Sequence, residues 1–179
     1  MGSNIEIKAR IEDLEGLKER VCRLSDGPAQ RIVQEDTFFH SKRGRLKLRI
    51  LAPDRGELIY YERDDGHGPQ RSTYIISPTA EPDSLRAILS ASHGIRGVVR
   101  KTRLLYMAGN TRIHLDEVDG LGAFLELEVV LGSGQSSEEG EALASELMRN
   151  LEIEPSALID VAYIDLLEES GIGPHALGG

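Results

Sequence analysis

Hydrophobic and polar residues alternate along much of this chain. The segment 5–11 alternates aliphatic side chains with ionised ones, and the segment 123–131 does the same around Glu126 and Glu128. Because successive side chains of a β-strand point to opposite faces, each segment predicts a strand with one apolar and one charged face.

The same alternation recurs between these two segments, bounded by turns rich in glycine, proline, asparagine and aspartate. Apolar residues at helical spacing occupy other stretches. The predicted strands cover residues 5–11, 31–39, 45–51, 57–63, 71–77, 97–107, 111–118 and 123–131. The predicted helices cover residues 13–26, 82–93, 138–151 and 155–169.

The charged faces of these strands allow two interpretations. Each could be the solvated side of an ordinary antiparallel sheet. Alternatively, the strands curl so that the charged faces line a lumen, where cations hold a polyanion and carboxylates hold its metal ion. Composition favours the lumen, because arginine suits bidentate phosphate recognition and the carboxylates are confined to three strands. The cations that share this parity are Lys8, Arg45, Lys47, Arg49, Lys101, Arg103 and Arg112, and the carboxylates are Glu6, Asp116, Glu126 and Glu128.

Composition places the chain among ordinary globular proteins. With 179 residues, 40% of them hydrophobic, it suits a single domain, which we expect to span residues 1–170, followed by a flexible tail at 171–179. The net charge is −9, which argues against a nucleic-acid partner. A single cysteine excludes a disulfide framework, and no apolar run is long enough to span a membrane. We therefore expect a cytoplasmic protein; the sequence leaves the oligomeric state open, with a homodimer as one alternative.

The charged residues suggest a specific chemistry. Several cations around one lumen repel one another unless an anion binds, and a triphosphate supplies both charge and acceptor oxygens. Carboxylates in the same lumen would repel that anion unless a divalent cation lay between them. Oxygen ligands and a phosphate substrate point to Mg²⁺ or Mn²⁺.

These residues resemble the CYTH family, the triphosphate tunnel metalloenzymes, over most of the chain. Asn4-Ile5-Glu6-Ile7-Lys8 stands where the family has E-x-E-x-K, so an uncharged amide replaces its first glutamate. The order and parity of the motifs together carry the resemblance. The other motifs are Leu46-Lys47-Leu48-Arg49, Arg63, Arg71, Lys101-x-Arg103, Arg112, Leu115-Asp116-Glu117-Val118 with Gly122, Glu126-Leu127-Glu128 and Tyr163-x-Asp165-Leu166-Leu167.

The resemblance implies an α+β fold: an eight-stranded antiparallel β-barrel, or tunnel, with helices packed outside. It implies metal ligation by Glu6, Glu126 and Glu128, with Asp116 a further candidate. Phosphate binding would fall to Lys8, Lys47, Arg49, Arg63, Lys101, Arg103 and Arg112. Lys8 could instead orient the attacking group. His114 has two interpretations: a catalytic group that contacts a phosphate or shuttles a proton, or a hydrogen-bonded residue of the wall.

The activity implied is metal-dependent chemistry on a triphosphate. We favour an adenylate cyclase of class IV, which forms cyclic AMP and pyrophosphate from ATP. A triphosphatase acting on inorganic, thiamine or nucleoside triphosphate needs the same cations. A third alternative, motivated by Asn4, is a sensor that binds a triphosphate without turning it over.

Overall fold

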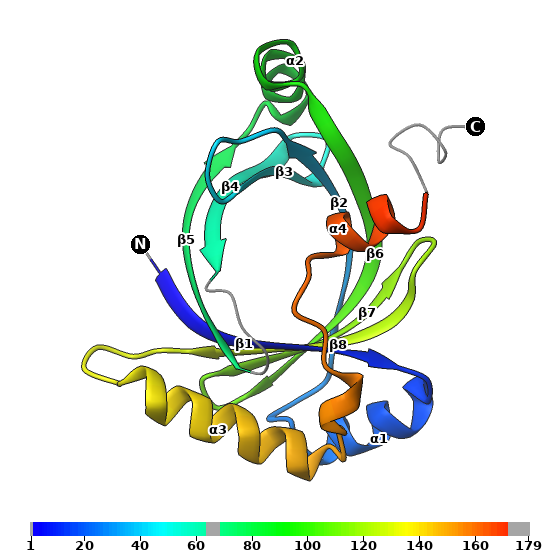
Figure 1. Cartoon of the computed structure of the whole chain (residues 1–179), viewed down its shortest axis with the longest axis vertical. Coiled ribbons are helices and arrows are strands. Elements are labelled where there is room, and N and C mark those ends of the chain that lie inside the picture. Colours follow the sequence, from blue (N-terminus) through cyan, green and yellow to red (C-terminus); the bar gives the residue numbers. More distant parts are fainter. Residues whose placement is uncertain (1, 64–68, 172–179) are drawn as a thin grey trace.

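Eight antiparallel strands close into a barrel, in the order β1-β5-β4-β3-β2-β6-β7-β8 (Figure 1). The structure is a computed structural model, and it describes residues 2–63 and 69–171. The strands are β1 (Gly2–Ile11), β2 (Gln30–Phe39), β3 (Arg45–Ala52), β4 (Arg55–Arg63), β5 (Gln70–Thr79), β6 (Ile95–Ala108), β7 (Thr111–Val118) and β8 (Gly122–Val130). The helices are α1 (Leu14–Leu24), α2 (Pro82–His93), α3 (Ser137–Asn150), the 3₁₀ turn η1 (Pro155–Ala157) and α4 (Tyr163–Glu169).

The predicted α+β barrel with outer helices is therefore confirmed. Closure joins the first and last strands, where Lys8 lies opposite Glu126 and Glu6 lies opposite Glu128. Closure also removes the exposed edges of an open sheet. The charged faces of β1, β3, β7 and β8, with Lys101 and Arg103 of β6, consequently line one interior.

The main hydrophobic core lies outside the barrel. The apolar parity of β1, β7 and β8 packs against α1 and α3, which lie together along one side of the barrel (Figure 1). A smaller group, Phe39, Leu48 and Leu89, joins α2 to β2 and β3. Because the helices cover the apolar faces of these strands, the opposite, polar faces point into the lumen.

The C-terminal part of the chain packs against inward-facing residues of the barrel. There α4 packs Tyr163, Ile164 and Leu167 against inward aromatic residues such as Phe124 and Phe38. Gly97 of β6 makes room for this helix, because a Cβ atom at that position would lie 2.4 Å from Ile164 Cδ1.

The single predicted helix over residues 155–169 is wrong in its first half. Residues 158–162 are extended, and Leu158 forms an isolated bridge with Ala9 of β1. The backbone N–H of Ile159 donates to the carbonyl of Lys8 at 3.0 Å. Pairing with β1 satisfies the backbone here, and the β-branched Ile159 and Val161 suit it.

One expectation lies largely outside the described residues: the tail predicted for residues 171–179 falls there from residue 172 onward. No helix in the described part of the chain is long and apolar enough to cross a membrane.

Candidate active site

The barrel encloses a cavity of about 400 Å³ lined by side chains from all eight strands. Its lining includes eight cationic and five carboxylate side chains, a formal excess of three positive charges in a chain whose net charge is −9. The cations are Lys8, Arg45, Lys47, Arg49, Arg63, Lys101, Arg103 and Arg112, and the carboxylates are Glu6, Asp36, Glu57, Glu126 and Glu128. This excess fits an anionic ligand.

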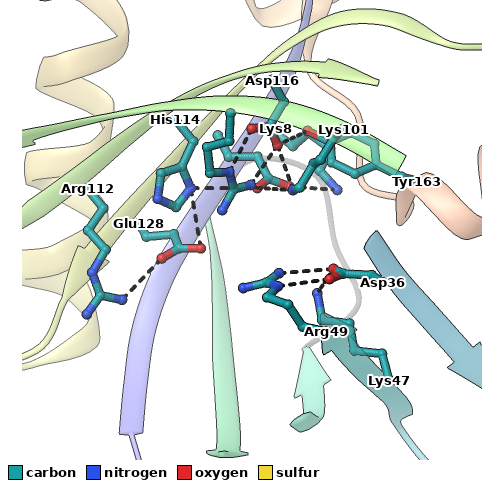
Figure 2. Close-up of polar contacts among 12 residues, drawn as sticks. Lys8, Asp36, Lys47, Arg49, Lys101, Arg112, His114, Asp116, Glu128 and Tyr163 are labelled. Carbon is teal, nitrogen blue, oxygen red and sulfur yellow. Dashed lines mark hydrogen bonds and ion pairs between the residues drawn. The ribbon is translucent and has the colours of Figure 1, made fainter. Parts of the chain in front are cut away.

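The first of two charged groups, the Asp36 cluster, consists of Asp36, Lys47 and Arg49 on β2 and β3 (Figure 2). Arg49 donates from Nε to Asp36 Oδ1 at 2.8 Å and from Nη2 to Oδ2 at 3.0 Å. Lys47 donates to Oδ2 at 2.7 Å. Strand pairing sets this arrangement, because Asp36 lies opposite Arg49 in the register of the two strands.

The two cations of the Asp36 cluster share a single carboxylate. Burial would raise the pKa of Asp36, but Arg49 and Lys47 hold it far below the usual range. Burial and repulsion from Arg49 lower the pKa of Lys47 to about 8, against the attraction of Asp36. Asp36 thus satisfies Arg49 but only partly offsets Lys47, which leaves positive charge for an anion.

The second group, the Glu126 cluster, lies on β1, β6, β7 and β8 and at the start of α4 (Figure 2). Its members are Lys8, Lys101, Arg103, His114, Asp116, Glu126, Glu128 and Tyr163. Arg103 bridges Asp116 and Glu126: it donates to Asp116 from Nε at 2.7 Å and from Nη2 at 2.6 Å, and Nη2 also contacts Glu126.

Asp116 is the most enclosed member of the Glu126 cluster. It is fully buried, and its Oδ2 also accepts from Lys101 at 2.8 Å and from the Tyr163 hydroxyl at 3.1 Å. Burial would raise its pKa, but Lys101 and Arg103 lower it to about 2. Both oxygens therefore already accept hydrogen bonds within the protein, so Asp116 acts here as an anchor for cations.

Glu126, Glu128 and His114 offer ligand atoms that all lie within 4.8 Å of one another. His114 Nδ1 is 3.6 Å from Glu128 Oε1 and 3.8 Å from Glu126 Oε2, and this buried atom has no hydrogen-bond partner within the described residues. Burial, followed by repulsion from Arg103, lowers the pKa of His114, which favours the neutral imidazole that ligates metals.

These three residues fit a divalent cation. Two carboxylates suit Mg²⁺ or Mn²⁺, and an additional imidazole suits Mn²⁺ better than Mg²⁺. Burial would raise the pKa of both carboxyls, but nearby cations lower it, so both are ionised as ligands must be. The orientation of His114 towards the carboxylates favours a metal or wall contact over direct contact with a substrate.

Glu6 lines the cavity next to this group but lies outside the 4.8 Å cluster. Burial and repulsion from Glu128 and Glu126 raise its pKa to about 7. Asn4 lies two residues before Glu6 on the same face of β1. It is also buried and lines the cavity, and its Oδ1 has no hydrogen-bond partner among the described residues. A cation close to Glu6 would favour its ionised form.

The structure brings every predicted site residue to one cavity or to its wall. Lys8 forms an ion pair with Glu126 at 3.1 Å, Arg63 lines the cavity near Glu6, and Arg112 lies 3.4 Å from Glu128 with a partly exposed side chain. Lys47, Arg49, Lys101 and Arg103 lie in the two clusters. Which of these residues hold phosphate or perform catalysis stays a prediction.

Sequence reasoning missed Asp36 and Tyr163 as site residues, and it missed the partner of Arg45. Asp36 carried a signal, because it shares strand parity with Gln34 and Phe38 and precedes a strand of inward cations. Arg45 pairs with Asp165 of α4 at 2.8 Å. The position of Tyr163 depends on the non-helical segment before α4. The apolar spacing of residues 155–169 predicted a helix there instead.

Comparison with known proteins agrees with this geometry. A Methanocaldococcus jannaschii protein named "putative adenylate cyclase" is 24% identical over 169 residues, which cover 90% of this chain and 97% of that protein. A Pyrococcus horikoshii structure superposes with a TM-score of 0.81 at 23% identity, over 91% of this chain and 98% of that one. A Hippeastrum structure superposes with a TM-score of 0.67 at 14% identity, over 96% of each chain. It is described as a "putative adenylyl cyclase" that reveals a dominant triphosphatase activity.

The family model of the CYTH domain matches residues 2–163, nearly the whole chain. CYTH proteins are divalent-metal-dependent enzymes, and the cluster of Glu126, Glu128 and His114 agrees with that property. The closed eight-stranded barrel, its inward charges and this match together show that the chain belongs to the CYTH family.

Proposed function

We propose that this protein is a divalent-metal-dependent enzyme that binds ATP inside its barrel and converts it to cyclic AMP and pyrophosphate. The observation that carries the proposal is the cavity itself, in which cations from five strands outnumber the carboxylates. Such a lining suits the several negative charges of a triphosphate.

The cavity also has apolar walls, which favour a nucleotide over inorganic triphosphate. Ile59 and Ile76 lie opposite each other on β4 and β5, and Ile32 and Leu105 line the cavity from β2 and β6. Inorganic triphosphate would leave this apolar surface uncovered, whereas the base of a nucleotide can bury it. The Methanocaldococcus jannaschii relative named as an adenylate cyclase supports the same assignment.

In the cyclase reaction the 3′-oxygen of ATP attacks the α-phosphorus, the bond from this phosphorus to the bridging oxygen of pyrophosphate breaks, and the 3′-hydroxyl releases its proton to solvent water. Lys47 and Arg49 bind phosphate oxygens from one wall, and Lys8, Lys101 and Arg103 do so from the other. The two clusters hold the triphosphate between them, which restricts its orientation for in-line attack.

Glu126 and Glu128, with His114 beside them, would hold the metal ion. Bound there, a divalent cation neutralises phosphate charge and stabilises the charge that develops on the leaving group. Asp116 keeps Lys101 and Arg103 in place without contacting the substrate.

A triphosphatase is the second candidate, because the Hippeastrum neighbour is described with a dominant triphosphatase activity. In that reaction water attacks the terminal phosphorus, the bond from this phosphorus to the bridging oxygen breaks, and the products are orthophosphate and the corresponding diphosphate. The same cations would bind the substrate, so the two activities differ in which phosphorus lies close to the nucleophile.

The test is incubation with ATP, inorganic triphosphate and thiamine triphosphate, each with Mg²⁺ or Mn²⁺, followed by chromatography of the products. Cyclic AMP with pyrophosphate from the wild type, absent with Glu126→Ala, is the expected result. Orthophosphate with the corresponding diphosphate, and no cyclic AMP, would overturn the cyclase in favour of the triphosphatase. Binding without any product would leave a sensor in place of an enzyme.

A further inference from the structure

Residues 158–162, which we call the strap, run from η1 past β1 and on to α4 (Figure 1). The strap pairs with β1 at the position of Lys8, because Ile159 N–H donates to the Lys8 carbonyl at 3.0 Å. It then delivers Ala162 and Tyr163 to the lining of the cavity. The strap therefore contacts both the backbone and the side chain of a predicted site residue.

The ammonium of Lys8 has three neighbours, of which two come from the strap and α4. It donates to the Val161 carbonyl at 3.3 Å, pairs with Glu126 Oε1 at 3.1 Å, and lies 4.0 Å from the centre of the Tyr163 ring. An ammonium group has three N–H donors. Among the described residues, the Val161 carbonyl accepts from one of them and the paired Glu126 carboxylate lies 3.1 Å from the ammonium, so a further N–H can meet a phosphate oxygen.

The ring of Tyr163 is itself fixed on several sides. Its hydroxyl donates to Asp116 at 3.1 Å, and the ring packs against Phe124 with the centroids 4.9 Å apart. Burial, then the charges of Glu126 and Asp116, raises its pKa well above the usual value, so the hydroxyl stays a donor. Lys101 also lies 5.0 Å from the ring centre, so this ring contacts both lysines of the Glu126 cluster.

The start of α4 is anchored to the barrel independently of these contacts. Asp165 accepts from the Ala162 backbone N–H at 2.9 Å and forms ion pairs with Arg45 at 2.8 Å and Arg96 at 2.6 Å. Arg45 and Arg96 belong to β3 and β6, two strands that do not pair with β1. Tyr163 is thereby held against the cavity from three parts of the barrel.

We infer that Tyr163 is a positioning residue: its ring and hydroxyl hold the ammonium of Lys8 in the orientation in which the remaining N–H meets the reacting phosphate. This inference rests on the proposed triphosphate chemistry of the same site. Tyr163 acts through Lys8 and, by way of Asp116, through Lys101 and Arg103, and it does not contact the reacting atoms.

The position of Lys8 can be tested without any activity. The chain holds five lysines, so selective labelling of the lysine ε-carbon gives five NMR signals, and Lys8→Met assigns the one of interest. An aromatic ring 4.0 Å from the ammonium shifts the neighbouring methylene signals upfield. We expect this shift in the wild type, its retention in Tyr163→Phe and its loss in Tyr163→Leu. A Lys8 signal at the position of an exposed lysine in the wild type would overturn the inference.

Tripolyphosphate is the probe for the ligand. It is added with Mg²⁺, because paramagnetic Mn²⁺ would broaden the NMR signals. If the free N–H of Lys8 meets a phosphate, the chemical shift of the Lys8 signal must change. No movement despite binding measured by calorimetry would contradict the role assigned to Tyr163. This result is separate from turnover, so a wild type that binds tripolyphosphate but turns over no triphosphate refutes the proposed function alone.

With an active wild type, kinetics separates positioning from a merely structural role. We expect Tyr163→Leu to lower kcat about 30-fold with KM changed less than about threefold, and Tyr163→Phe to stay within about fivefold of wild type. Tyr106→Phe is the matched control, because this buried tyrosine lies in the outer core against Cys22. Wild-type kcat in Tyr163→Leu, with only its melting temperature lowered, would show a structural role and overturn the inference.

Discussion

The two charged clusters of the barrel differ in how many carboxylates they contain and in what those carboxylates contact. In the Asp36 cluster one carboxylate serves two cations, and every strong contact runs between β2 and β3. In the Glu126 cluster three cations meet Asp116 and Glu126, and Glu128 and His114 lie beside them with ligand atoms in reach of one ion. The Asp36 cluster therefore offers cations to an anion, whereas the Glu126 cluster also offers ligand atoms to a metal ion.

This difference indicates a division of labour across the lumen. The Asp36 cluster has an excess of positive charge and a cation, Lys47, whose pKa falls to about 8. The Glu126 cluster has Glu6 nearby with its pKa raised to about 7 by burial and by neighbouring carboxylates. The Asp36 cluster would be stabilised by a bound anion, and the carboxylates at the Glu126 cluster would be stabilised by a bound cation. A metal–triphosphate complex supplies both.

The largest effect is expected at Glu126. Glu126→Gln keeps the shape of the side chain but removes the charge that Lys8 and Arg103 contact and that a metal ion requires. We expect kcat/KM with the preferred triphosphate to fall about 1,000-fold, a loss of about 4 kcal/mol of transition-state stabilisation. Glu117→Gln, an exposed position on the outer face of β7, is the matched control and retains wild-type kinetics. A Glu126 variant with near wild-type activity would contradict the assignment of the Glu126 cluster as the reactive wall.

Arginine-to-lysine changes on the two walls sharpen the comparison. Arg103 donates two hydrogen bonds to Asp116 and reaches Glu126, so lysine cannot replace its geometry. Arg49 donates two hydrogen bonds to Asp36 alone. We expect kcat/KM to fall about 100-fold in Arg103→Lys and about 10-fold in Arg49→Lys, with the smaller effect mainly in KM. The reverse order, measured by steady-state kinetics, would mean that the reactive wall is the one around Asp36.

Glu6 and Asp36 predict opposite responses of stability to pH. The pKa of Glu6 is about 7 in the folded state, above its usual 4.5, so its favourable contribution is present below pH 4.5 and is lost as pH rises through 7. The pKa of Asp36 is depressed, so its contribution is present above pH 3.8 and is lost as pH falls further. Glu6→Gln should therefore raise the melting temperature at pH 8 by a few degrees and change it little at pH 4.5.

Calorimetric melting between pH 4 and 8 in metal-free buffer measures this effect. Glu12→Gln, exposed just beyond β1, is the control and keeps the wild-type profile. If the melting temperature of Glu6→Gln varied with pH in parallel with that of the wild type, Glu6 would not have a raised pKa in the folded protein.

The smallest effect concerns proton uptake at the Asp36 cluster. Because the pKa of Lys47 is about 8 in the free protein, it is partly deprotonated at pH 8, and a bound polyanion favours its charged form. Tripolyphosphate binding at pH 8 should take up a fraction of a proton, which titration calorimetry in buffers of different ionisation enthalpy measures. Lys47→Met should reduce this uptake, while exposed Lys18→Met leaves it unchanged. Equal uptake in Lys47→Met would place the titrating group elsewhere.

Much of this architecture follows from strand parity. The alternation in β1, β3, β6, β7 and β8 predicts which side chains face inward, because barrel closure leaves a strand only two faces. The inward cations and the acids Glu6, Glu126 and Glu128 could therefore be predicted. Hairpin turns such as Gly109-Asn110 place the strand ends within a residue or two.

What the sequence does not convey are contacts set by the tertiary structure. Parity places Asp36 inward, but only the register between β2 and β3 shows that it binds both Lys47 and Arg49. The strap has the spacing of a helix, and its pairing with β1 overrides that preference. The contact between Tyr163 and Lys8 depends on this pairing, so no local pattern predicts it.

The central claim is that a triphosphate binds between the two clusters with its metal ion at Glu126 and Glu128. A crystal structure with Mn²⁺ and a non-hydrolysable ATP analogue, with anomalous diffraction to locate manganese, tests it most directly. We expect an anomalous peak in contact with both carboxylates, and phosphate oxygens within hydrogen-bonding distance of Lys47 and Arg49 on the opposite wall. Manganese or nucleotide bound only at the outer surface of the barrel would contradict the account.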